Sequence, residues 1–64
     1  MRILLPDKSV KIVEGEKVTV EKILLGLGIR PNEVIVTLNG RLIPEDTIVG
    51  GDDELKIIRV THGG

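Results

Sequence analysis

The chain has 64 residues with a formal net charge of −1, and its nine basic and ten acidic residues are interspersed. It contains no Cys, Phe, Tyr or Trp, which excludes disulfides, thiolate metal sites and an aromatic platform for stacking nucleic-acid bases. Its length allows one small domain and no apolar run approaches the roughly 18 residues of a membrane span, so we expect a cytoplasmic protein with no nucleic-acid or membrane partner.

Two β-strands joined by a turn are predicted at the start of the chain. Residues 1–5 are mostly apolar and residues 10–13 again favour a strand, since β-branched side chains suit a pleated surface. Between these segments, Pro6 presets the φ angle at the second position of a turn. We therefore expect residues 1–13 to form a β-hairpin.

The spacing of apolar residues then changes to that of an amphipathic helix. Four of them recur at i, i+3, i+4 and i+7 on one helical face: Val20, Ile23, Leu24 and Leu27. Thr19 is a suitable N-cap, and Glu21 places a negative charge in the first turn, where the helix dipole favours it. Gly28 fits the left-handed position after the helix, and Pro31 blocks its continuation.

The second half of the chain is predicted to contain three strands. Residues 34–38 are the clearest of them, and Asn39-Gly40 follows as a type I′ hairpin signal, because both central residues of that turn need a positive φ. The remaining segments are, in order, a strand at 41–43, loops at 44–47 and 50–53, and a strand at 55–60.

A helix and a small sheet must bury their apolar faces against each other, so this order of elements predicts a two-layer α+β domain over residues 1–60. We expect one small sheet packed on one helix. The predicted core residues are Ile3, Leu5, Val10, Ile12, Val20, Ile23, Leu24, Leu27, Val36, Leu38, Leu55 and Ile57.

No catalytic centre is predicted within this domain, which we therefore do not expect to be an enzyme. Nucleophilic catalysis needs a nucleophile beside a base, whereas Ser9 lies in a predicted turn and His62, the one histidine, lies near the last residue. The carboxylates at 45–46 and 52–54 are interpreted as solvated loop residues. No cluster of His or Cys residues indicates a metal site.

Residues 61–64 are expected to form a flexible tail, Thr61-His62-Gly63-Gly64, with a chemical role. Gly63 and Gly64 lack Cβ atoms, so a narrow channel in another protein can close around them. A terminal carboxylate is an anion at neutral pH and a poor electrophile. Acyl transfer from Gly64 therefore requires activation, for example as a mixed anhydride with AMP. An inert tail is the alternative interpretation.

Three segments together resemble the β-grasp sulfur carriers of thiamine and molybdopterin biosynthesis, the ThiS/MoaD family, and the related ubiquitin-related modifiers and archaeal small modifier proteins. They are the strand, Asn-Gly turn and strand at 34–44, the Gly-Asp approach to the last strand at 51–58, and the Gly63-Gly64 pair. The hairpin is most similar to thiamine-type carriers, whereas residues 61–64 look more like the tail of the ubiquitin-related modifiers.

The resemblance implies a β-grasp (ubiquitin-like) fold, with a mixed sheet of four to five strands packed on one helix and with the first and last strands parallel at the centre of the sheet. It also implies that an E1-like adenylating enzyme activates the Gly64 carboxylate with ATP and Mg²⁺. A sulfur donor then converts the product into a thiocarboxylate, which supplies sulfur to an accepting synthase. The chain itself is implied to bind no cofactor.

The family leaves other functions open. In its modifier branch, the activated carboxyl group forms an isopeptide bond with lysines of target proteins. A β-grasp interaction domain with an inert tail is a further alternative. The pathway, whether thiamine or molybdopterin biosynthesis or tRNA thiolation, is chosen by the accepting enzyme and is not specified by these residues.

A docking surface for the adenylating enzyme is predicted on the face of the last strand that points away from the core. If Leu55 and Ile57 point into the core, the alternate residues of the strand point to the opposite face. Four aliphatic residues are expected there, near the tail: Ile58, Val60, Ile35 and Leu42. They form either a docking patch or the scattered surface aliphatics of any protein.

Overall fold

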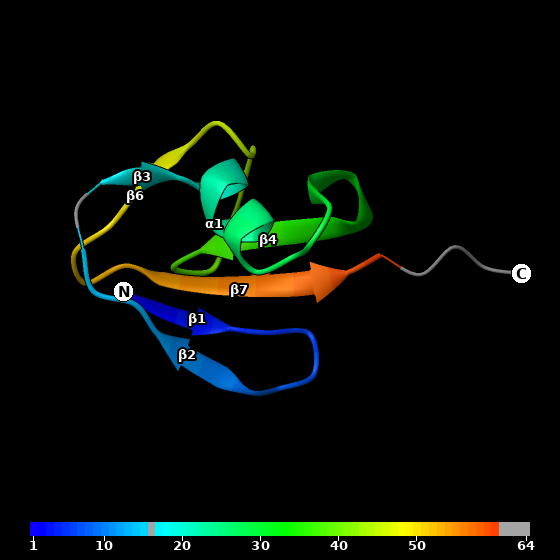
Figure 1. Cartoon of the computed structure of the whole chain (residues 1–64), viewed down its shortest axis with the longest axis horizontal. Helices are drawn as coiled ribbons and strands as arrows, with labels where there is room; N and C mark the ends of the chain where they lie inside the picture. The colour runs from blue at the N-terminus through cyan, green and yellow to red at the C-terminus, as the bar shows by residue number, and fades with distance from the viewer. Residues whose placement is uncertain (16, 61–64) are drawn as a thin grey trace, which may run out of the picture.

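The computed structural model describes residues 1–15 and 17–60 of the chain. Within them, helix α1 (Val20–Gly26) packs on one face of a five-stranded sheet (Figure 1). The strands of this sheet are β1 (Arg2–Leu4), β2 (Val10–Ile12), β4 (Val34–Leu38), β5 (Arg41–Ile43) and β7 (Glu54–Arg59). Two short strands, β3 (Val18–Thr19) and β6 (Ile48–Val49), pair separately, and a 3₁₀ turn, η1 (Pro31–Glu33), leads into β4.

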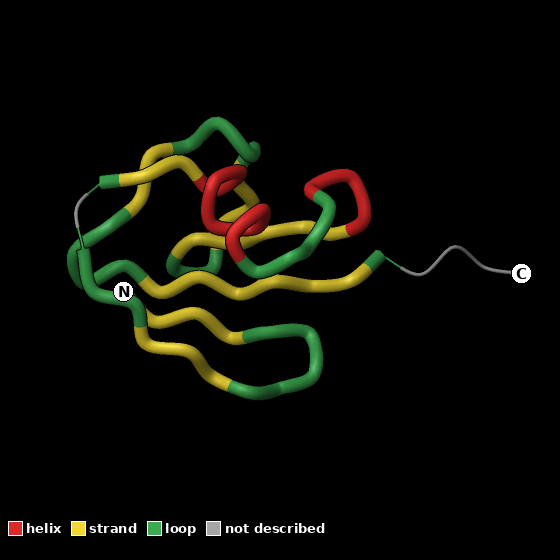
Figure 2. Tube along the Cα trace, viewed as in Figure 1, coloured by secondary structure: helices red, strands yellow, loops and turns green. Residues whose placement is uncertain are grey.

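The strand order is β2-β1-β7-β4-β5, so the last strand occupies the centre of the sheet and the first strand lies beside it. The β1 and β7 strands run parallel, with Ile3 opposite Leu55, whereas the other neighbours in this sheet are antiparallel. Figure 2 shows α1 over the layer formed by the strands. The predicted α+β architecture, with a mixed sheet and parallel first and last strands, is confirmed.

Local side-chain chemistry sets both ends of α1 where the sequence predicts them. The Thr19 hydroxyl accepts a hydrogen bond from the Lys22 backbone N–H, 3.3 Å away, and so caps the first turn. At the other end Gly28 has a φ of +75°. The Ile29 N–H then donates to the Leu24 carbonyl at 2.9 Å, which is the 6→1 bond of a Schellman motif.

The Asn39-Gly40 turn is the predicted type I′ hairpin, since φ is +49° at Asn39 and +89° at Gly40. Asn39 has a second role that the hairpin signal does not contain. Its side-chain oxygen accepts from the Glu54 N–H at 3.1 Å, while its own N–H donates to the Glu54 carbonyl at 2.9 Å. The turn is thereby joined to the first residue of β7.

Most of the predicted core is confirmed. Six of the predicted residues are buried: Ile3, Val20, Leu24, Val36, Leu55 and Ile57. Four more are partly buried and pack against that cluster: Leu5, Ile23, Leu27 and Leu38. The prediction is wrong for Val10 and Ile12, whose side chains are 45% and 65% exposed.

Strand register explains the error at Val10 and Ile12. Lys11 is the residue directly opposite Ile3 in the β1–β2 ladder. Directly opposed residues point to the same face of a sheet, and Ile3 is fully buried beneath the helix layer. The two aliphatic residues of β2 therefore point to the other face, at an edge of the sheet.

The sequence analysis missed the β3–β6 pairing and the core residues Val34 and Val49. Val49 lies opposite Val18 in that two-stranded sheet, within a stretch that has too few residues to show an alternating pattern. The segment that carries Val49 is held next to α1, because the Val20 N–H at the start of the helix donates to the Thr47 carbonyl just before β6, at 3.0 Å. Val49 is therefore buried beside the helix.

Candidate functional site

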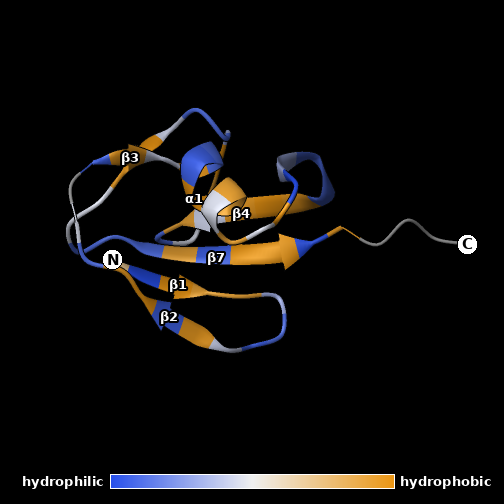
Figure 3. Ribbon diagram, viewed as in Figure 1, coloured by the Kyte–Doolittle hydropathy of each residue, from blue (hydrophilic) through white to orange (hydrophobic). Residues whose placement is uncertain are grey.

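The face of the five-stranded sheet that α1 leaves uncovered, called here the open face, carries three of the four predicted docking residues. Ile58 and Ile35 lie directly opposite each other on β7 and β4. Leu42 on β5 lies opposite Thr37, two residues beyond Ile35 on β4. Ile58, Ile35 and Leu42 are 40%, 42% and 71% exposed, and Figure 3 shows the apolar colouring of β4 and of the end of β7.

These three residues gather on one face because Leu55 and Ile57 are buried under the helix. A strand alternates its side chains, so Lys56 and Ile58 must point the other way. The placement of Ile58, Ile35 and Leu42 agrees with the prediction for the sheet. Val60, the fourth predicted residue, follows the last residue of β7 instead of lying within the ladder.

A hollow of about 520 Å³ opens between β1 and β7. Its apolar lining includes Leu4, Pro6 and Ile58, and its basic lining includes Lys8 and Lys56. Leu4 and Lys56 lie opposite each other in the parallel ladder. The sequence analysis did not identify Leu4 or Pro6 as part of this surface, because their approach to Ile58 depends on the register between β1 and β7.

The end of β7 is held in place by η1. The Val60 N–H donates to the Glu33 carbonyl at 2.9 Å. The Glu33 carboxylate lies 3.8 Å from the Arg59 guanidinium and 4.0 Å from that of Arg30. Exposed ion pairs of this kind are worth little individually, so the backbone hydrogen bond is the main local constraint on the direction in which the chain leaves the sheet.

The predicted acyl end, Gly64, and the rest of the predicted tail, Thr61, His62 and Gly63, lie outside the described residues. The structure describes the chain as far as Val60, beside the end of η1. Figure 1 shows this end of β7 on the same side of the molecule as the β1–β2 turn. The role assigned to the tail stays a prediction.

Two carboxyl groups, those of Asp7 and Glu45, have pKa values shifted from the ordinary ones. The Ser9 hydroxyl and the Ser9 N–H both donate to the Asp7 carboxylate and lower its pKa. This contact makes Ser9 part of the turn, in accord with its structural interpretation. The Glu45 carboxyl shares a hydrogen bond with that of Glu21, which raises the pKa of Glu45.

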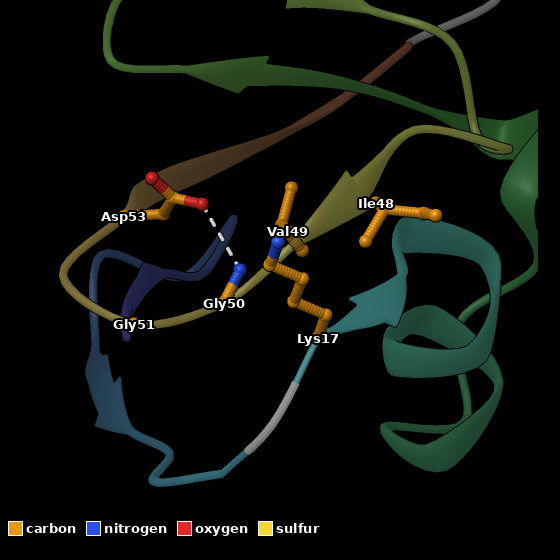
Figure 4. A pocket seen from close by; sticks show the side chains of 6 residues that line it. All are labelled: Lys17, Ile48, Val49, Gly50, Gly51 and Asp53. Atoms are coloured by element: carbon orange, nitrogen blue, oxygen red, sulfur yellow. Dashed lines mark hydrogen bonds between the residues drawn. The ribbon is translucent and has the colours of Figure 1, made fainter.

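A second hollow lies at the β3–β6 end of the molecule, away from the end of β7 (Figure 4). It is lined by Lys17, Ile48, Val49, Gly50, Gly51 and Asp53. The Asp53 carboxylate accepts the Gly50 N–H at 2.9 Å, so its role is to close the loop before β7. Across residues 1–15 and 17–60, no three His, Asp or Glu side chains gather as metal ligands.

None of the helical segments within the described ranges is long and apolar enough to cross a membrane.

Comparisons with known proteins give a family match and a structural match. A model of the ThiS family matches residues 2–64. The crystal structure of a thiamine biosynthesis protein (ThiS) from Geobacter metallireducens is 24% identical in sequence, with a TM-score of 0.68 and 100% of both chains covered. Among curated proteins, none matches this sequence.

A solution structure determined by NMR, also of a thiamine biosynthesis protein from Geobacter metallireducens, is 25% identical with a TM-score of 0.63. The match covers 100% of this chain and 88% of that one. Both structures share the arrangement of helix and mixed sheet described above. The predicted β-grasp fold is thereby confirmed.

Proposed function

The chain belongs to the ThiS family, and we propose that it acts as a sulfur carrier in thiamine biosynthesis. The observation that carries this proposal is the family match over residues 2–64, which spans both the folded domain and the Gly63-Gly64 pair. The similar thiamine biosynthesis structures from Geobacter metallireducens support the choice of pathway. The protein is then a co-substrate on which enzymes act, and not itself an enzyme.

The proposed chemistry takes place on the Gly64 carboxylate and has two steps. In the first, a carboxylate oxygen attacks the α-phosphorus of ATP in the site of an adenylating enzyme, with Mg²⁺, and pyrophosphate leaves. In the second, a sulfur nucleophile from a donor attacks the acyl carbon and AMP leaves. Where the donor supplies sulfide, this step leaves Gly64 as a thiocarboxylate. Where it supplies a persulfide, a thiol must cleave the S–S bond of the resulting acyl disulfide and is itself oxidised to a disulfide as the thiocarboxylate forms. An accepting synthase then uses the thiocarboxylate as its sulfur source.

Such chemistry explains why the domain needs no catalytic residue of its own. Its task is to present a narrow acyl end to an enzyme that supplies the nucleotide site. The open face supports this role, because Ile58, Ile35 and Leu42 expose apolar surface next to the strand from which the tail continues. We propose that this surface docks the adenylating enzyme while the tail occupies the active site.

The test is mass spectrometry of the protein after incubation with ATP, Mg²⁺, the source organism's adenylating enzyme and a sulfur donor. We expect one oxygen of Gly64 to be replaced by sulfur. Oxidation of Met1 adds nearly the same mass, so the shift must be located in the peptide 60–64, which trypsin releases by cutting after Arg59. A variant that lacks Gly64 is the control and should show no shift.

Two other outcomes correspond to the alternatives. A remnant of residues 60–64 on lysines of other proteins indicates a protein modifier, which residues 61–64 resemble in sequence. If deletion of Gly64 leaves the function of the protein in cells unchanged, the tail is inert and the sulfur-carrier proposal is wrong.

A further inference from the structure

The hollow between β1 and β7 combines apolar residues with three basic ones. Leu4, Pro6 and Ile58 belong to its apolar lining, and Lys8, Lys56 and Arg59 to its basic lining. Arg59 is paired with Glu33. Lys56 alternates with the buried Leu55 and Ile57 on β7. Its side chain therefore leaves the sheet on the open face, beside Ile58.

Two acidic residues near this hollow, Asp7 and Glu33, are engaged elsewhere, and Glu54 shares the open face of β7 with Lys56 but forms no ion pair with it among the described residues. The Asp7 carboxylate accepts both donors of Ser9 in the β1–β2 turn. The Glu33 carboxylate lies between Arg59 and Arg30. Among the ion pairs of residues 1–15 and 17–60, neither Lys8 nor Lys56 takes part, so both ammonium groups are available to an incoming surface.

The hollow also lies near the end of β7, which an enzyme that binds residues 61–64 must approach. Ile58 precedes Val60 by two residues, and the Val60 N–H is held by the Glu33 carbonyl. The direction of the chain at the end of β7 is therefore constrained relative to the hollow. An enzyme that threads residues 61–64 into its active site faces this end of the molecule.

We propose that the β1–β7 hollow seats an apolar side chain of the adenylating enzyme, and that carboxylates flanking this side chain on the enzyme face Lys8 and Lys56. The inference rests on the proposed function and adds the chemistry of the partner surface. A non-polar centre bordered by acidic residues is the complement of an apolar hollow bordered by lysines.

The role of the two lysines is to speed encounter and set orientation, since charges at the border of an interface act chiefly on the association rate. The rate of adenylation at low carrier concentration should therefore fall as salt is added, because ions screen exposed charges over about 8–10 Å at 0.1–0.15 M. The rate at saturating carrier should change little.

The experiment compares steady-state adenylation of three forms by the source organism's adenylating enzyme, followed as pyrophosphate release. The forms are the wild-type chain, the double variant Lys8→Glu/Lys56→Glu, and Lys22→Glu. The last is a control for charge reversal outside the hollow, since Lys22 is an exposed residue of α1 on the covered side of the sheet. For the double variant we expect kcat/KM to fall about tenfold or more at low salt, with kcat nearly unchanged.

A graded series strengthens the test. The neutral double variant Lys8→Gln/Lys56→Gln should lie between wild type and the reversed variant and lose most of the salt dependence of kcat/KM. In the reversed variant kcat/KM should rise with salt, because ions screen the repulsion between its new carboxylates and those of the enzyme. Circular dichroism spectra equal to that of the wild type show that the exposed substitutions leave the fold intact.

The possible failures are distinguishable. If wild type is adenylated normally and the double variant matches Lys22→Glu in both kcat/KM and salt dependence, the acidic partner surface is wrong and the sulfur-carrier function stands. If the enzyme releases no pyrophosphate with wild type, the proposed function is wrong and this inference falls with it.

Discussion

Ile58 belongs both to the central strand of the sheet and to the proposed docking surface. It lies opposite Ile35 on the open face and also lines the β1–β7 hollow. Its side chain is 40% exposed, whereas its neighbour Ile57 is buried in the core. Two adjacent isoleucines on one strand thus have different roles, because alternate positions of a strand point to opposite faces.

We predict that Ile58→Asp leaves the fold intact but slows adenylation. The carboxylate replaces apolar surface at the centre of the proposed interface and must lose water there without a partner, so a loss of tenfold or more in kcat/KM is expected, equivalent to at least about 1.4 kcal/mol. Pyrophosphate release measures it.

Ile12→Asp is the matched control for this substitution. Ile12 is also an exposed isoleucine of the open face, but it lies on the edge strand β2, away from the end of β7. If Ile58→Asp and Ile12→Asp have the same adenylation kinetics as wild type, Ile58 has no docking role.

Glu45 and Glu21 form a carboxyl pair at the start of α1, and their shared hydrogen bond raises the pKa of Glu45. A carboxyl group whose pKa is higher in the folded state stabilises the fold below its unfolded pKa. That contribution is lost as the pH rises through the folded pKa. The Asp7 carboxylate, whose pKa is lowered by Ser9, acts in the opposite sense.

We predict that Glu45→Gln stabilises the protein relative to wild type progressively as the pH is raised from about 4 to about 7. Glutamine keeps a hydrogen-bonding group beside Glu21 and carries no charge at any pH. Thermal unfolding followed by circular dichroism across this range measures the difference. A difference between the two proteins that stays constant across this range would contradict the assignment.

The helix layer and the edge strand differ in what they contribute to stability. Leu24 of α1 is buried against β-strand residues of the core, whereas Ile12 of β2 is exposed. Burial of an aliphatic side chain supplies roughly 1.5–3 kcal/mol. Its removal from a packed core also leaves a cavity.

We predict that Leu24→Ala costs about 2–5 kcal/mol of unfolding free energy, while Ile12→Ala costs less than about 1 kcal/mol. Urea unfolding followed by circular dichroism measures both. Because the larger loss is comparable to the whole stability of so small a domain, Ile57→Val is the milder core variant and should cost about 0.5–1.5 kcal/mol. A loss for Ile12→Ala as large as that for Leu24→Ala would contradict the core described here.

The whole molecule has one core shared by its two layers. The buried cluster draws residues from α1 and from strands at both ends of the described chain. β1 and β7 are far apart in sequence but adjacent at the centre of the sheet. Neither layer can bury its apolar face without the other, so the open face and the end of β7 are held as a single rigid unit.

We predict that helix and sheet unfold together. Backbone amide signals of α1 and β1 in NMR spectra should disappear at the same urea concentration, as expected for a two-state domain of this size. NMR is the suitable probe because the chain has no Trp, Tyr or Phe to report by fluorescence. Loss of the α1 signals well before those of β1 would show that the layers are independently stable.

Features that depend on a few consecutive residues were predictable from the sequence. The Thr19 cap, the positive φ of Gly28 and the Asn39-Gly40 turn follow from local hydrogen bonding and backbone sterics. The family resemblance drawn from 34–44 and 51–58 is confirmed by the family match. The placement of Ile58 and Ile35 on one face was predictable as well, because strand alternation is a local property.

Long-range pairing governs the features that the sequence analysis missed or placed wrongly. Val10 and Ile12 are outside the core because the β1–β2 register sets Lys11 opposite Ile3. Val49 is inside it because β6 pairs with β3 beside the helix. The β1–β7 hollow exists because the two ends of the chain become neighbours in the sheet. A strand segment specifies that its side chains alternate, but its partners in space determine which of the two sets is buried.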